Sequence, residues 1–250
     1  MVHHPSRVPD SGDRAARAET ILRTAADLLC RHGYRRVTID DVAKQAAIGK
    51  GTVYLHWKSR GELFQAVLSR ESSAAIDELL SALRGGTQAW RLHQFARAYF
   101  LAIVTRPLLL GALISDRDLL GALLTADGQR EARHQLVAQN YVEILGAAGL
   151  VRKDMSARAI SDAFLATFEG FVHVEAEHAP VAPASRHPPS PATEARAELL
   201  AQTVRRAFEE EPELTADEQR EIADQVIDLL AGLQNEDLAP RAPRTTTSRS

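Results

Sequence analysis

The sequence predicts an all-α protein in which a small N-terminal domain is joined by a long helix to a larger helical domain. Helix-forming Ala, Leu, Glu and Arg dominate the composition, whereas runs of alternating β-branched residues are absent. Apolar residues recur at helical spacing along most of the chain. A chain of 250 residues that is 45% hydrophobic can also bury a sizeable core, as one large or two modest domains.

The composition excludes several classes of protein. Cys30 is the only cysteine, which excludes an internal disulfide, and its place in an apolar run indicates a small buried hydrophobe. No apolar stretch approaches the roughly 18 residues needed to span a bilayer, and the first residues lack a signal-peptide core. We therefore expect a cytoplasmic protein with no membrane partner.

No catalytic pattern is present in the sequence. It has no glycine-rich phosphate loop, no Gly-x-Ser-x-Gly and no His-Glu-x-x-His, and His173 and His178 are spaced so that they share a helix face poorly. The sequence therefore predicts no enzyme activity, no metal site and no cofactor.

Charge is divided unevenly along the chain. Residues 1–70 contain 12 Lys and Arg against 7 Asp and Glu, a net charge of +5. Because the whole chain has a net charge of −3, residues 71–250 carry a net charge of −8. Basic residues concentrated in one part of a chain are typical of phosphate binding, and an acidic remainder keeps the rest of the protein away from nucleic acid.

The N-terminal segment is expected to be a flexible arm, residues 1–12, followed by a helix from Asp13 to Arg31. Gly33 closes this helix where a left-handed residue is favoured. Two interpretations of the arm are open. Arg7, Arg14 and Arg17 could reach phosphates or a minor groove, or the arm could be a solvated tail.

The segment 38–57 has the pattern of a helix-turn-helix. Thr38 and Asp41 have the spacing of a helix start. The apolar residues that follow recur at i, i+3, i+4 and i+7, the spacing of one helix face: Ile39, Val42, Ala43 and Ala46. The tripeptide Ala47-Ile48-Gly49 then interrupts the pattern, as a tight turn does. A second helix is expected over Lys50 to Trp57.

This second helix has only one apolar pair, Val53 and Trp57, to bury. The outward residues combine a cation, a hydroxyl, a phenol, an imidazole and an apolar side chain: Lys50, Thr52, Tyr54, His56 and Leu55. Such a set suits phosphate hydrogen bonds, base-edge contacts and thymine-methyl packing. Gly51 lets a DNA backbone approach closely.

The start of the next helix follows directly. Ser59 and Glu62 have the spacing of a capping box, and Lys58 and Arg60 beside them suit phosphate binding.

The span from about Ala18 to Leu68, above all ILRTAADLLCRHGYRRVTIDDVAKQAAIGKGTVYLHWKSRGELF, resembles the N-terminal DNA-binding domain of the TetR family of bacterial transcriptional regulators. The preceding helix, the His-Gly-Tyr stop, the Thr-Ile-x-x-Val-Ala opening and the Gly-Thr-Val-Tyr-x-His-Trp helix occur in order. Ala47 stands where the family usually has Gly, and Gly49 where it often has Ser or Thr. These departures weaken a left-handed turn residue and a helix cap by about 1 kcal/mol each.

The resemblance implies a homodimeric, ligand-responsive regulator, most often a repressor, that binds a palindromic operator in double-stranded DNA. It implies that Thr52, Tyr54 and His56 contact bases and phosphates and that other residues hold the DNA backbone. The predicted DNA-binding residues are Thr38, Lys50, Gly51, Thr52, Tyr54, His56, Lys58 and Arg60.

One alternative from another class of protein remains open. A helix-turn-helix pattern also occurs in helical proteins that never touch DNA. The chain would then be a ligand-binding or protein-interaction module without specific operator recognition. Such a protein predicts weak, strongly salt-sensitive DNA binding with no preferred sequence.

The domain boundaries follow from these patterns. The helix-turn-helix domain is expected over residues 13–60, and a helical effector-binding and dimerisation domain over 61–234. A long helix from Arg60 to Leu83 joins them, so that its rotation would displace the recognition helix.

The second domain is expected to hold helices over 88–105, 129–148, 155–178, 194–210 and 215–233, with two short helices between 108 and 124. In the resembling family such helices surround a cavity for a small effector. Residues that join an apolar body to one polar atom suit such a cavity, and the candidates are Trp90, Tyr99, His134 and Tyr141. Packing in the core is the alternative for each of them.

The last third of the chain has three further features. Residues 179–193 are Pro-rich and predict a flexible loop, and residues 235–250 predict a disordered tail. In the resembling family the late helices pair across a two-fold axis. The helix 155–178 and one of the last two helices would form this pair here, although packing within one chain is an open alternative.

Overall fold

The structure is a computed structural model that describes residues 11–85, 88–124, 128–178 and 186–237. Within these ranges it contains helices α1 to α11, one 3-10 helix and a single isolated β-bridge, between Val151 and Glu209. The all-α prediction is confirmed.

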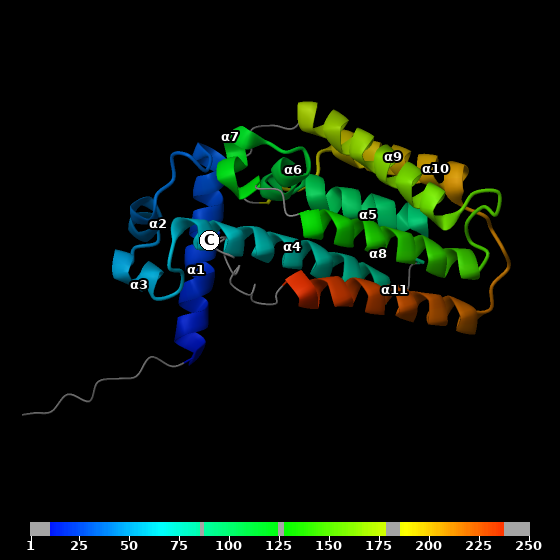
Figure 1. Ribbon diagram of the computed structural model, residues 1–250, viewed down its shortest axis with the longest axis horizontal. Helices are drawn as coiled ribbons and strands as arrows, with labels where there is room; N and C mark the ends of the chain where they lie inside the picture. Colours follow the sequence, from blue (N-terminus) through cyan, green and yellow to red (C-terminus); the bar gives the residue numbers. More distant parts are fainter. Residues whose placement is uncertain (1–10, 86–87, 125–127, 179–185, 238–250) are drawn as a thin grey trace, which may run out of the picture.

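The described residues form a small head and a larger body (Figure 1). The head consists of α1 (Ser11–His32), α2 (Ile39–Gln45) and α3 (Lys50–Tyr54). The body begins with α4 (Arg60–Arg84), which runs out of the head, and continues with α5 (Leu92–Val104), α6 (Pro107–Leu113), α7 (Arg117–Leu120) and η1 (Gly121–Leu124). It ends with α8 (Gly128–Ala147), α9 (Ala157–His178), α10 (Pro191–Phe208) and α11 (Ala216–Asp237).

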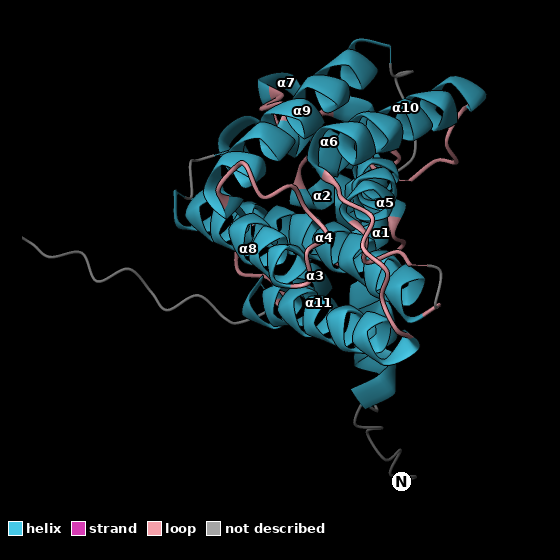
Figure 2. Ribbon diagram, turned by 90° about the vertical axis from the view of Figure 1, so that its right-hand side faces the viewer, coloured by secondary structure: helices cyan, strands magenta, loops and turns pink. Residues whose placement is uncertain are grey.

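The long helices of the body lie in three layers. In the views of Figures 1 and 2, α4 and α11 lie on one side, α5 and α8 in the middle, and α9 and α10 on the other side. One apolar cluster fills the space between the layers, and its largest members are aromatic: Trp90, Phe100, Tyr141, Phe164, Phe168 and Phe208. The faces that pack together are therefore the apolar stripes that the helical spacing predicted.

The core of the head is a second, separate cluster. It holds apolar side chains of α1, α2 and α3, and it extends past residue 60 to Leu63, Phe64, Val67 and Leu68 of α4. Leu108 of α6, Leu120 of α7 and Leu123 of η1 complete it. The body therefore supplies part of the head's core, which fixes how the two units sit relative to each other.

Backbone contacts reinforce this joint. Tyr34 N–H, in the turn after α1, donates to the carbonyl of Leu119 at 2.8 Å. Gly33, at φ 71°, lies so close to α7 that a Cβ on it would be 2.6 Å from the carbonyl oxygen of Asp118. A left-handed glycine was expected at this position, and the close approach to α7 gives it a second reason.

A series of ion pairs also crosses the joint. Glu19 of α1 pairs with Arg70 of α4 at 2.6 Å, and Arg70 pairs with Glu71 at 2.6 Å. The Nε of Arg106, at the bend between α5 and α6, lies 3.8 Å from a carboxylate oxygen of Glu71, and its Nη2 lies 2.5 Å from Glu78. The series therefore runs from the head to the middle of the body.

Arg106 is unusual because its side chain is only 1% exposed. Its Nη1 donates to the carbonyl of Ala102 at 2.7 Å, whereas its Nε finds no hydrogen-bond partner among the described residues. Burial raises the pKa of Glu71, against the lowering effect of Arg70 and Arg106. A charge buried in this way is stabilised by its partners and is costly to leave alone.

The helix boundaries differ from the sequence prediction at several ends. The helix expected over 88–105 begins only at Leu92, and Trp90 therefore lies in a turn. The carboxylate of Glu209 accepts from the backbone N–H of His93 at 2.7 Å and so occupies the start of α5. A contact of this kind joins residues 116 positions apart, which local patterns do not reveal.

Two other boundaries differ from the prediction. The helix α10 begins at Pro191 instead of residue 194, since Ser190 caps it and proline fits the first helical turn. The helix α3 ends at Tyr54, earlier than the expected Trp57. The predicted arm lies outside the described residues up to residue 10, as does the Pro-rich loop from 179 to 185 and the tail from 238.

Among the described residues, no single helix is long and apolar enough to cross a membrane, although the pair α5 and α6 passes by length and composition with a bend of 108° between its halves.

Candidate nucleic-acid interface

The start of α2 is fixed by a reciprocal pair of hydrogen bonds. The hydroxyl of Thr38 accepts from the N–H of Asp41 at 3.2 Å, and the carboxylate of Asp41 accepts from the N–H of Thr38 at 2.9 Å. The side-chain and then the backbone hydrogen bond from Thr38 lower the pKa of Asp41. The helix start predicted here is confirmed and takes the form of a capping box, so the hydroxyl of Thr38 is used inside the head.

The turn between α2 and α3 has the two weaknesses that the sequence predicted. Ala47 has φ 53°, in the left-handed region that favours glycine. Gly49 stands at the N-cap of α3 without a side chain to accept a hydrogen bond. Ile48 N–H nevertheless donates to the carbonyl of Ala43 at 3.0 Å, which closes the turn.

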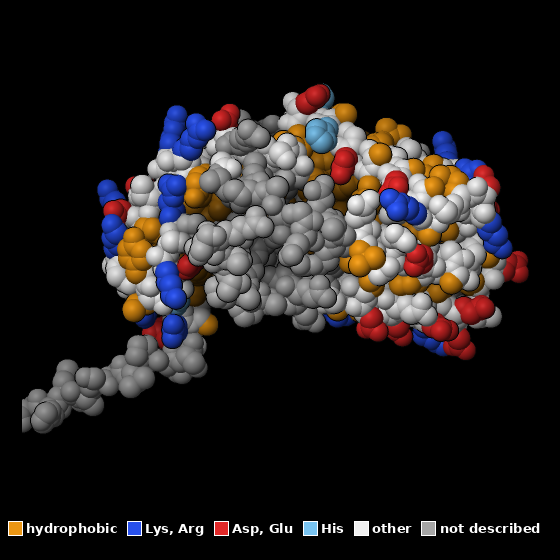
Figure 3. Space-filling model, in the orientation of Figure 1, with side chains coloured by type: hydrophobic (Ala, Val, Ile, Leu, Met, Phe, Trp, Pro, Cys, Tyr) orange, Lys and Arg blue, Asp and Glu red, His pale blue; other side chains and the backbone are white. Residues whose placement is uncertain are grey.

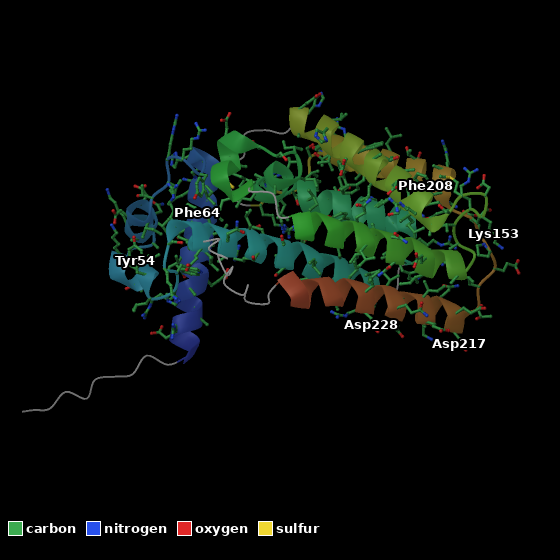
Figure 4. The ribbon with its side chains drawn as sticks, viewed as in Figure 1. Tyr54, Phe64, Lys153, Phe208, Asp217 and Asp228 are labelled. Carbon is green, nitrogen blue, oxygen red and sulfur yellow. The ribbon has the colours of Figure 1, made fainter. Side chains whose placement is uncertain are left out.

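The helix α3 buries one side chain and presents the others. Val53 is fully buried in the head core, whereas Tyr54 is 46% and Leu55 74% exposed. Tyr54 lies at the outer tip of the head in Figure 4, on the side away from the body, while Phe64 lies inside the head. A Cβ on Gly51 would have nothing within 4 Å, so a DNA backbone can come close there. Large exposed side chains at the tip of a short helix indicate a contact surface.

Two of the predicted phosphate ligands already have partners inside the head. The ammonium of Lys50 lies 2.9 Å from the carboxylate of Asp40, and both groups are exposed. The guanidinium of Arg60 lies 4.3 Å from the ring centroid of Tyr34 and donates to the carbonyl of Val37 at 3.2 Å. Arg60 therefore holds the turn between α1 and α2, in addition to any contact with phosphate.

The cap of α4 differs in one detail from the expected box. The hydroxyl of Ser59 accepts from the N–H of Glu62 at 3.1 Å, as predicted. The carboxylate of Glu62, however, accepts from the N–H of Lys58 at 2.8 Å, one residue earlier than in the usual box. This contact fixes the backbone of Lys58, whose side chain is exposed.

His56 is half-buried beside the N-terminal part of α1. Its ring lies 5.3 Å from that of Trp57, centroid to centroid. Burial, and then the positive charges of Arg14 and Arg17, hold the pKa of His56 below its ordinary value. A neutral imidazole at pH 7 has one donor and one acceptor nitrogen, which suits hydrogen bonding to base edges.

Sequence reasoning missed part of the basic surface. Arg35 and Arg36 are exposed in the turn between α1 and α2, and their adjacency at the start of the helix-turn-helix was the available signal. Figure 3 shows Lys and Arg side chains over the end that carries the head, whereas Asp and Glu gather along the lower right edge, where α11 runs. The uneven charge of the sequence is therefore also uneven in space.

The four effector candidates are placed differently. The hydroxyl of Tyr141, 3% exposed, donates to the carbonyl of Trp90 at 2.7 Å, and Trp90 is itself buried. Tyr99 is half-buried and stacks on Phe168, with ring centroids 4.9 Å apart. His134 belongs to α8, but its side chain lies outside the described residues. Trp90, Tyr99 and Tyr141 are thus brought into one aromatic core, and their role towards an effector stays a prediction.

No group of three or more His, Cys, Asp and Glu side chains in the described part of the chain is arranged to hold a metal ion.

The family model described as "Bacterial regulatory proteins, tetR family" matches residues 21–67. The HTH-type transcriptional regulator YhgD of Bacillus subtilis is 37% identical over 67 residues, 26% of this chain and 35% of the relative. The transcriptional repressor TetR of Mycobacteroides abscessus is 35% identical over 63 residues, 25% of this chain and 33% of the relative. The transcriptional activator FasR of Mycolicibacterium smegmatis is 31% identical over 93 residues, which are 36% of this chain and 42% of the relative. The matches thus span well under half of these relatives.

Solved structures share the fold over most of the chain. A TetR-like transcriptional regulator from Rhodococcus sp. RHA1 superposes with a TM-score of 0.53 at 19% identity, covering 80% of this chain and 97% of the other. A transcriptional regulator from Saccharomonospora viridis, solved in complex with choline, superposes with a TM-score of 0.57 at 17% identity, covering 79% and 100%. At such low identity these structures support the fold alone.

Proposed function

We propose that the chain, which matches the TetR family of bacterial regulatory proteins over residues 21–67, is a sequence-specific DNA-binding transcriptional regulator. One observation carries the proposal: α3 buries Val53 and presents Tyr54 and Leu55 at the tip of a head whose surface is basic. In this proposal α3 enters the major groove, where Thr52, Tyr54 and His56 contact base edges. Lys50, Lys58 and the missed Arg35 and Arg36 hold phosphates.

The proposed regulator is a homodimer that pairs through α9 and α10. The helices α9 and α10 contact each other in one outer layer of the body, whereas α11 lies in the opposite outer layer, where it packs on α4 and α8 with Val226 and Leu230 buried. The phenylalanine stripe of α9 faces its own core, so the pairing surface is the opposite face. There Val174 of α9 and Leu199 of α10 are exposed. Two heads related by such a dimer read half-sites in successive major grooves, about 34–36 Å apart.

The proposed effector is a small molecule that binds the body and changes the spacing of the two heads. The structure solved with choline is a protein of the same fold that holds a small ligand. An effector shifts the equilibrium only by its difference in affinity for the two states of the dimer. Release of a repressor is the usual form in the family. The relatives include one named as a repressor and one named as an activator, so either sign is compatible with the fold.

The test of this function is selection of bound duplexes from a randomised pool at about physiological salt, followed by sequencing. Enrichment of one palindrome is expected, and its half-site spacing gives the geometry of the dimer. A matched selection with Lys153→Ala, a change on the exposed surface of the body, should enrich the same palindrome. A pool that stays random would leave only phosphate attraction and would favour the interaction-module alternative.

A further inference from the structure

A pocket of about 290 Å³ lies in the body between α4, α5 and the segment that precedes α10. Its apolar lining comes from Ala98, Leu101 and Ala102 of α5, together with Leu79 of α4 and Pro189. Three charged side chains, Glu78, Arg97 and Arg186, also line it. An apolar hollow with a few convergent polar groups is the usual form of a small-molecule site.

The two arginines of this pocket supply hydrogen-bond donors for an anion. Arg97 and Arg186 line it together with Glu78. Arg186 pairs with Glu78 at 2.9 Å, and Arg97 pairs with Glu194 at 2.6 Å and with Glu198 at 3.7 Å. A guanidinium has five N–H donors in a planar fork, so these partners do not exhaust it. Each arginine can therefore bind a ligand carboxylate, either beside its present partner or in exchange for it.

We propose that this pocket binds a small amphipathic monocarboxylate, and that it is the effector site of the regulator. The carboxylate contacts Arg186 and Arg97, and the apolar part lies on Ala98, Leu101 and Ala102. The volume is at the lower end of ligand pockets, which limits the ligand to roughly ten non-hydrogen atoms. The effector role rests on the proposed function, whereas binding of the carboxylate does not.

The pocket is connected to the head by the ion pairs that cross the joint. Glu78 forms an ion pair with Arg186 at the pocket and accepts a hydrogen bond from Arg106 at the bend between α5 and α6. When a ligand carboxylate replaces Glu78 as the partner of Arg186, Glu78 keeps only its ion pair with Arg106. Arg106 lies beside Glu71, and Arg70 carries the series on to Glu19 of α1. Ligand binding thus changes the charge balance at the bend from which Leu108 enters the head core.

The segment before α10 is itself attached to the end of α5. The N–H of His187 donates to the carbonyl of Thr105, the C-cap residue of α5, at 3.0 Å. A ligand that bridges Arg186 and Arg97 therefore joins two elements that already touch at the bend. Thr105, the residue next to Arg106, also lines the pocket, so the ligand lies against the end of α5.

Binding is tested by isothermal titration calorimetry of the full-length protein without DNA, with sodium octanoate as the probe. Octylamine has the same chain with the opposite charge, and acetate has the charge without the chain; both are expected to bind at least tenfold more weakly. Arg186→Ala and Arg97→Ala should each lower octanoate affinity at least tenfold, and Ala98→Leu, which enlarges an apolar lining side chain, should do so without a change of charge. Arg220→Ala, at the start of α11, is the matched control and should leave the affinity unchanged.

Two results would overturn the site. Octylamine that binds as tightly as octanoate would refute the chemistry, and equal octanoate affinity in the wild type and in both arginine variants would refute the location. Circular dichroism of each variant checks that the helices persist, so that lost binding is not lost folding.

The effector role is tested with the selected operator in a second titration. Octanoate should change operator affinity at least fivefold, and Glu19→Gln should reduce that change while octanoate affinity in the absence of DNA stays the same. Operator affinity that ignores bound octanoate would refute the effector role. If no operator is enriched, the proposed function fails, and the calorimetric result on octanoate still stands by itself.

Discussion

The head and the body use the same kinds of side chain in opposite ways. Tyr54 of α3 is 46% exposed at the tip of the head, whereas Tyr141 of α8 is 3% exposed, and its hydroxyl is bonded to the carbonyl of Trp90. Both residues join an aromatic ring to a polar atom. In the head this combination is exposed to solvent, and in the body the ring is buried and the polar atom has its partner in the core.

The difference follows from the size of the two units. The head has one long helix and two short ones, and their apolar cluster around Val53 and Phe64 encloses little volume, so most side chains of the head remain outside. The body has layers of long helices with enough interior to take up its aromatic residues. A polar aromatic residue in a large helical domain is therefore a weaker sign of a binding site than the same residue in a small one.

The strongest test of how head and body are joined is Arg106→Met. Removing one partner from a buried pair costs about 3–5 kcal/mol, and we expect about 3 kcal/mol because Glu71 keeps Arg70. Urea unfolding measures the loss. Arg220→Met, which removes an exposed arginine, should change stability by less than about 1 kcal/mol.

The same variant should show a specific dependence on pH. The pKa of Glu71 is already raised by burial, and loss of Arg106 raises it further. A raised pKa favours folding at low pH and loses that contribution as pH rises through the folded pKa. The cost of Arg106→Met should therefore be larger at pH 8 than at pH 5, and Glu71→Gln in the same background should remove the dependence. If the loss of unfolding free energy were the same at both pH values, Arg106 would not influence the pKa of Glu71.

The next largest effect is expected at the tip of the head. Tyr54→Ala combined with His56→Ala should lower operator affinity by at least about 30-fold, since each of the two lost base contacts is worth about 1–3 kcal/mol. Fluorescence anisotropy with labelled operator measures it, and gel filtration checks that the dimer persists. The matching pair in the body, Tyr99→Phe with Tyr141→Phe, should leave operator affinity within about twofold. Unchanged affinity in the head variant would refute the recognition-helix assignment.

The sequence predicted the head better than the body, for physical reasons. The cap at Thr38, the left-handed Ala47 and the uncapped Gly49 all follow from bonds within a few residues, and the structure confirms each. The sequence did not reveal the contacts in the head between residues that are far apart in the chain. Examples are the contact of Arg60 with the ring of Tyr34 and the packing of three leucines from residues 108–123 in the head core.

In the body, the sequence predicted helices but not their partners. The late start of α5 depends on Glu209, and the burial of Arg106 depends on Glu71 and Glu78 of another helix. The pocket at Arg97 and Arg186 joins residues that no local pattern connects. Such contacts are decided by how long helices cross, and one sequence does not contain that information in readable form.

Two glycines allow the contact between head and body to be measured separately from backbone strain. Gly33 and Gly149 have φ 71° and 70°, but only Gly33 faces a neighbour, the carbonyl oxygen of Asp118. Alanine at either position pays for the left-handed backbone, about 1–2 kcal/mol. Gly33→Ala should be the more destabilising by a further ~1 kcal/mol, because the backbone of α7 must move. Equal losses in urea unfolding would mean that the head is not pressed against α7.

The smallest effect is expected at the turn of the helix-turn-helix. Ala47→Gly relieves about 1–2 kcal/mol of left-handed strain, and the greater freedom of glycine in the unfolded chain offsets about 0.5–1 kcal/mol of this. A net gain of about 0.5 kcal/mol is expected, measured by thermal unfolding. The matched change Ala15→Gly, at an exposed position of α1, should instead lose about 1 kcal/mol. Operator affinity of Ala47→Gly should stay within about twofold, because the strain lies in the turn and not in the groove-facing side chains. A loss of affinity would instead mean that alanine at this turn helps to hold α3 in its binding position.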